Sequence, residues 1–156
     1  MFLDIFFIFI YIVAALCAWH ICVADWRRRI IPDAYLWPLL ICGVILAASH
    51  TWPIGPRMAA AGMATGYVLA AGIGFIFDWG LRRKNPTADA PIGMGDIKLI
   101  ATGGVWLGPG GMAIALIAAC ITGAIWGMAH KQKYIPFAPF FVTGAILAFI
   151  IDRFLI

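Results

Sequence analysis

The chain has 156 residues, of which 64% are hydrophobic and only 12% are charged. Soluble globular domains are about half apolar and about a quarter charged, so this chain has too little polar surface to fold in water. Its net charge of +4 could suggest nucleic-acid binding, but the basic residues cluster in short gaps between apolar stretches, which is how membrane topology is encoded. The composition excludes a soluble enzyme and a nucleic-acid-binding module, and it predicts an all-α bundle in a lipid bilayer.

Six apolar segments follow one another along the chain. The first, at about 2–24, begins without the positive charge of a cleavable signal peptide, so we expect a permanent first helix. The others fall at about 34–49, 58–79, 97–107, 110–129 and 136–154. The second and fourth are shorter than the roughly 17–25 residues of a spanning helix, so flanking residues must extend them.

We therefore predict one membrane-embedded domain, 1–156, with about six transmembrane helices. A tight turn at 108–111, of sequence Gly-Pro-Gly-Gly, joins the fourth helix to the fifth. Five helices with a re-entrant segment are the main alternative. Four cysteines lie inside apolar stretches without a C-x-x-C pair, so we expect no metal site.

Charge asymmetry between the gaps predicts the orientation. Nine of the eleven basic residues fall in or beside the first, third and fifth gaps, and only Arg57 and Arg153 lie on the other side. Because positive charge is retained in the cytoplasm, these three gaps are expected inside and both termini outside. The sequence thus predicts a multi-pass protein of the bacterial inner membrane.

Small residues recur every four positions along the third predicted helix, at Gly62, Gly66, Ala70 and Gly74. Such a ridge lets another helix backbone approach closely. Ordinary helix packing accounts for this pattern, so we assign these residues no chemistry.

Every acidic residue is an aspartate, and most have ordinary positions. Four lie near the termini, in the third loop or at the end of the third helix, where water is accessible: Asp4, Asp78, Asp89 and Asp152. Asp25 ends the first predicted helix and Asp96 begins the fourth, both at the predicted cytoplasmic boundary. Carboxylates at membrane depth are costly, about 2.5–3.5 kcal/mol at a helix centre and less near the edge. Such groups need a partner or a function.

Two carboxylates held together can share one proton, so that one acts as general base on a water while the other polarises a carbonyl group. This chemistry hydrolyses peptides without a metal or an organic cofactor. The alternative is that Asp25 and Asp96 cap helices or pair with nearby Arg29 and Lys98. Gly93 and Gly95 before Asp96 favour the first interpretation, since glycines permit unusual backbone geometry and close approach of an extended substrate.

At these residues the sequence resembles the type IV prepilin peptidase family, aspartyl membrane proteases of the G-x-G-D class. The resemblance rests on three stretches, which occur in the same order as in the family. The first is 25–33, which begins with Asp25 and ends in I-P-D. The second is G-M-G-D-I-K-L at 93–99 with the glycines that follow, and the third is I-P-F-A-P-F at 135–140. The resemblance implies that Asp25 and Asp96 are catalytic, and it places Gly93, Gly95 and Lys98 in the active-site or substrate-positioning loop. Asp33 receives no catalytic role and is expected to start the second helix, where an aspartate after proline suits a cap and the helix dipole.

The resemblance also implies the substrate, a prepilin or pseudopilin whose short basic leader is removed at the cytoplasmic face, before its transmembrane helix. The small-residue ridge of the third helix is one candidate surface for docking that helix. Longer family members carry a cysteine-rich cytoplasmic insertion and methylate the new N-terminus. Here the first loop is short and has no cysteine tetrad, so the chain is similar to the peptidase-only branch that serves Flp/Tad pili. We expect no methyltransferase activity and no need for S-adenosylmethionine.

Two other functions use the same features. A small proton- or cation-coupled transporter would also contain membrane carboxylates, but it predicts aspartates in mid-helix and an internal repeat. An inactive scaffold of a secretion machine would keep the fold without the activity. The sequence does not predict the oligomeric state.

Overall fold

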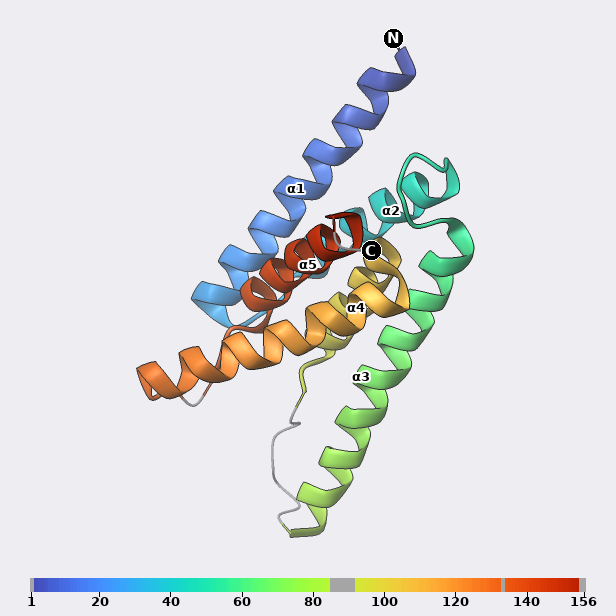
Figure 1. The fold of residues 1–156 in the computed structure, drawn as a ribbon. Coiled ribbons are helices and arrows are strands. Elements are labelled where there is room, and N and C mark those ends of the chain that lie inside the picture. The colour runs from blue at the N-terminus through green and yellow to red at the C-terminus, as the bar shows by residue number, and fades with distance from the viewer. Residues whose placement is uncertain (1, 85–91, 133, 155–156) are drawn as a thin grey trace.

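In the computed structural model, residues 2–84, 92–132 and 134–154 are described, and these residues form helices without a β-strand among them. The all-α prediction is therefore confirmed (Figure 1). The helices are α1 Phe2–Arg28, α2 Asp33–Ala48, α3 Pro56–Lys84, α4 Met94–His130 and α5 Phe137–Phe154.

Helix α4 combines the fourth and fifth predicted helices into one element. It is interrupted only at Gly108, which has φ 67° and ψ −180°, a conformation that essentially only glycine adopts. Pro109 follows and cannot donate a backbone N–H to the helical ladder. The two halves of α4, yellow and orange in Figure 1, point in different directions. The described chain thus has five helical elements where six were predicted, with the break at the predicted position.

Three helices are long and apolar enough to cross a bilayer, at Leu3–Arg28, Pro56–Arg83 and Met94–His130. Helix α2 has only 16 residues, in line with the short second segment that the sequence predicted. These lengths and compositions fit a multi-pass membrane protein.

Helices α3 and α4 pack with their backbones in close contact, as the small-residue ridge predicted. A methyl group on Gly62 would lie 2.8 Å from the carbonyl carbon of Gly104, and one on Gly66 would lie 3.0 Å from the carbonyl oxygen of Ile100. Ala70 of the same ridge is also buried. Because α4 covers the ridge, the suggestion that this surface docks a substrate helix is wrong.

Helix α5 packs against α4 and α1, while α2 contacts α1, α3 and α4. Large buried side chains from four of the helices form the core, including Ile21, Leu46, Leu99, Met112 and Phe141. This packing brings the C-terminal end of α1 next to the N-terminal end of α5 (Figure 1).

Candidate active site

Asp25 lies in the last turn of α1 and is buried, with 5% of its surface exposed. Its Oδ2 atom accepts a 2.7 Å hydrogen bond from the backbone N–H of Ala138, in the first turn of α5. The first N–H groups of a helix have no partner within the helix, and they stabilise negative charge. Arg29, one turn further along, also interacts electrostatically with this carboxylate. The Asp25 carboxylate is thus held by the beginning of the last helix.

Asp96 lies in the first turn of α4 and is partly buried. The Asp96 carboxylate lies beside the backbone of Gly93, the N-cap residue of this helix. The Asp96 carboxyl group also interacts electrostatically with that of Asp25. The structure therefore places the two aspartates that the sequence singled out within electrostatic reach of each other.

The glycines before Asp96 serve close packing. Gly93 has φ −70° and ψ 144°, values open to any residue, and Gly108 is the one glycine with positive φ in the described chain. The expectation of unusual backbone geometry at Gly93 and Gly95 is therefore wrong. A methyl group on Gly93 would lie 3.2 Å from Asp96 Oδ2, and one on Gly95 would lie 2.9 Å from Cβ of Ile31. Gly95 thus lets the start of α4 approach the loop that follows α1, and Gly93 leaves room for the Asp96 carboxylate.

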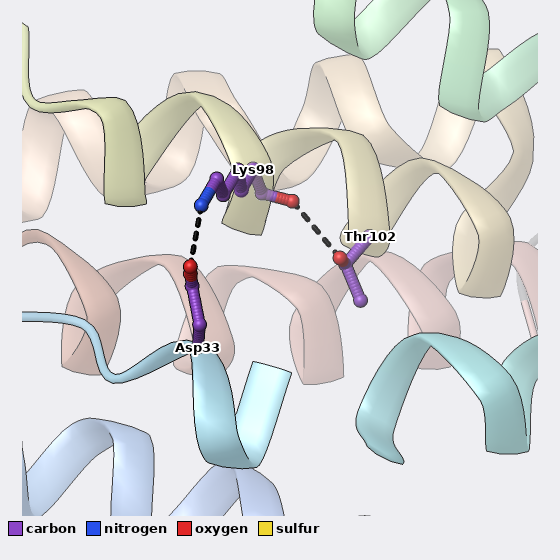
Figure 2. Close-up of polar contacts among 3 residues, drawn as sticks. All are labelled: Asp33, Lys98 and Thr102. Carbon is purple, nitrogen blue, oxygen red and sulfur yellow. Dashed lines mark hydrogen bonds and ion pairs between the residues drawn. The ribbon is translucent and has the colours of Figure 1, made fainter. Parts of the chain in front are cut away.

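Lys98 forms a 2.6 Å ion pair with Asp33 (Figure 2). Asp33 is the first residue of α2, as predicted, but Pro32 occupies the N-cap position, and the Asp33 carboxylate binds Lys98. The expectation that Asp33 caps the helix is therefore wrong. The backbone carbonyl of Lys98 accepts a 2.9 Å hydrogen bond from the hydroxyl of Thr102. The ion pair fixes the start of α2 to the first turns of α4.

An aromatic cluster beside Asp25 was missed by the sequence reasoning. Trp26 packs edge-on against Trp126 of α4, with ring centroids 5.3 Å apart. Trp126 also stacks on His130 at 4.6 Å and contacts Phe140 of α5 at 6.0 Å. The four-residue spacing of Trp126 and His130 was a visible signal, but their partners come from other helices. The cluster ties α1, α4 and α5 together next to the site.

The charge on one of these carboxyl groups affects the other. The Ala138 N–H and Arg29 stabilise a negative charge on Asp25, and a negative charge on Asp25 disfavours a second one on Asp96. In general, two carboxyl groups coupled in this way suit a reaction that needs one base and one acid. Among the described residues, no group of three or more His, Cys or Asp side chains could hold a metal ion.

Comparison with known proteins connects this site to one family. A sequence model described as the type IV leader peptidase family matches residues 12–128. The chain is 30% identical over 132 residues to a prepilin leader peptidase/N-methyltransferase of Aeromonas salmonicida, with 80% of this chain and 43% of the relative covered. It is 31% identical over 139 residues to a type 4 prepilin-like proteins leader peptide-processing enzyme of Escherichia coli, with 86% and 49% covered.

A third relative, a prepilin leader peptidase/N-methyltransferase of Burkholderia pseudomallei, is 32% identical over 145 residues, with 84% of this chain and 45% of the relative covered. The chain spans less than half the length of each of these three curated relatives. No solved structure matches it. The matched residues include both aspartates and most of the two helices that carry them, and the chain belongs to the type IV leader peptidase family.

Proposed function

We propose that this chain is an aspartic endopeptidase of the bacterial inner membrane that removes the leader from prepilin-like substrates. Asp25 and Asp96 are its catalytic residues. The observation that carries the proposal is the placement of Asp25, buried and hydrogen-bonded at the end of α1, within electrostatic reach of Asp96 in the first turn of α4. The names of the relatives, which are leader peptidases and a leader peptide-processing enzyme, support the same substrate class.

In the proposed mechanism, the ionised Asp25 is the general base. The hydrogen bond from Ala138 N–H and the charge of Arg29 stabilise its negative charge. Asp25 takes a proton from a water, whose oxygen attacks the carbonyl carbon of the substrate, while the protonated Asp96 donates to the carbonyl oxygen. The intermediate then collapses, the C–N bond breaks, and the proton held by Asp25 passes to the leaving amine. As the intermediate collapses, one of its two hydroxyl groups returns a proton to Asp96, so both aspartates regain their starting state.

We place the site at the cytoplasmic face, with both termini on the opposite side. The support is the distribution of basic residues, since Arg27 and Arg28 end α1, Lys84 ends α3, and Lys131 follows α4. Gly93, Gly95 and Lys98 form the edge at which the substrate lies. Lys98 acts there by holding the start of α4 against α2 through Asp33.

We further propose that this chain does not methylate its product, although relatives are named for both activities. The support is the short connection from α1 to α2, residues 29–32, and the wide separation of the cysteines, which lie in α1, α2 and α4. The test is incubation of the purified protein with substrate and S-adenosylmethionine. We expect an unmodified new N-terminus, and mass-spectrometric detection of N-methylated product would contradict this proposal.

The catalytic pair is tested by reconstituting the wild type, Asp25→Asn and Asp96→Asn in liposomes with a prepilin. Asparagine keeps a side-chain oxygen that can accept the Ala138 N–H, so the fold is expected to persist. General acid–base catalysis is worth about 10²–10⁴-fold in rate, so each variant should lose at least a factor of about 100. Asp78→Asn is the control, since Asp78 pairs with Arg82 at the surface of α3. Normal processing by either active-site variant would exclude that residue from catalysis.

A further inference from the structure

An apolar groove of about 480 Å³ lies between α1, the first half of α4 and α5. Binding pockets typically occupy about 300–1,000 Å³. None of the described residues that line the groove carries a charge, and Thr102 in its wall directs its hydroxyl to the carbonyl of Lys98. Two of the walls, α1 and α4, belong to helices of membrane-spanning length and composition. The lining of the groove therefore suits an apolar group rather than a charged one.

The groove begins one helical turn from the aspartate pair. On each of its three walls, a lining residue stands three positions away from a residue of the site, which places both on the same helix face. The Cys22 thiol also interacts electrostatically with the Asp25 carboxylate. The three pairs are Cys22 and Asp25 of α1, Leu99 and Asp96 of α4, and Phe141 and Ala138 of α5. The groove therefore begins beside residues of the site on all three of these helices.

The opposite end of the groove is closed by aromatic rings. Trp52 stacks on Phe149 with centroids 4.9 Å apart and contacts Tyr11 at 5.9 Å. From Tyr11 to Cys22 the groove follows α1 for about 16 Å at about 1.5 Å per residue. This length is roughly half of the 30 Å hydrocarbon core. The groove is therefore long enough to hold about three turns of a second helix beside α1.

We propose that the groove binds an apolar helical segment of the polypeptide substrate, immediately next to the bond that is cut. This inference rests on the proposed peptidase function. Alanines on facing walls, such as Ala15 and Ala145, let a helix backbone approach closely. A lipid acyl chain does not need such backbone proximity, and only a polypeptide continues into a peptidase site. Recognition follows the helix-in-groove mode, with apolar side chains as anchors.

The first test fills the groove. Ala15→Phe and Ala145→Phe place a ring in it, while Leu16→Phe and Leu147→Phe change neighbouring exposed positions on the same helices outside the lining. Two substrates are compared in proteoliposomes, a full-length prepilin and a short peptide that contains the cut site without the apolar segment. We expect the groove variants to raise KM for the prepilin at least tenfold and to leave peptide cleavage unchanged. Equal KM values in all four variants would overturn the proposal.

The second test does not depend on catalysis. A photo-crosslinking amino acid is placed at position 15, 16, 145 or 147 of the Asp96→Asn variant, which is mixed with prepilin. Adducts with the prepilin's apolar segment are expected from positions 15 and 145, and not from 16 and 147. No adduct, equal adducts from all four positions, or adducts only with lipid acyl chains would overturn the groove assignment. If wild-type protein cuts neither substrate, the peptidase proposal fails, while the crosslinks still decide what occupies the groove.

Discussion

The contact between α3 and α4 makes a quantitative prediction for Gly62→Ala. The new methyl group would lie 2.8 Å from the carbonyl carbons of both Gly104 and Gly108, whereas ordinary contact begins at 3.4 Å. The helices must therefore separate by at least 0.6 Å at this point. Overpacking typically costs about 1–3 kcal/mol, and backbone atoms cannot rotate away as side chains do, so we expect the upper end of this range.

Gly72→Ala is the matched control, because it lies in the same helix and a methyl group there meets nothing within 4 Å. Both substitutions gain about 1 kcal/mol of helix propensity, so the difference between them isolates the packing cost. Unfolding free energies are measured by denaturant titration in mixed micelles, followed through the fluorescence of the seven tryptophans. Gly62→Ala should be about 3 kcal/mol less stable than Gly72→Ala, and equal stability would refute the backbone contact.

Three further predictions concern other contacts. Gly108→Ala forces a side chain into a conformation that costs about 1–3 kcal/mol, so the same titration should show a loss of this size. Trp52→Phe removes a 2.6 Å hydrogen bond to the backbone carbonyl of Trp106 and should cost about 0.5–1.5 kcal/mol; an unchanged unfolding free energy would contradict this. Lys98→Gln and Asp33→Asn should lower the processing rate equally, because both substitutions break the same partly exposed ion pair between these two residues. Such a pair is worth at most about 1 kcal/mol. A much larger loss for Lys98→Gln would instead indicate direct contact with substrate.

Local sequence features predicted the helices well, because each apolar stretch carries its own signal. The break at Gly108 was predicted from its Gly-Pro-Gly-Gly context, yet only one residue leaves the helical conformation. A single glycine with positive φ bends the chain sharply while the helical ladder resumes at once. Sequence patterns locate such a break, but they do not determine whether it separates two helices or bends one.

The pairing of Asp25 with Asp96 was predictable from topology, since the ends of two helices were expected at the same membrane face. The donor to Asp25 was not predictable, because the partner is a backbone N–H of Ala138, 113 positions away, and backbone groups leave no mark in a side-chain pattern. The role of Gly95 was also not predictable from the sequence. Its role is to leave space for Ile31, and a missing side chain does not reveal which neighbour uses the space.

The hydrogen bond from Ala138 to Asp25 also bears on biosynthesis. Helix α1 leaves the ribosome long before α5. While the residues between them are being made, the Asp25 carboxylate therefore lacks its hydrogen-bond donor, the Ala138 N–H. The complete environment of this carboxylate therefore forms only after α5 has been made and has packed against α1.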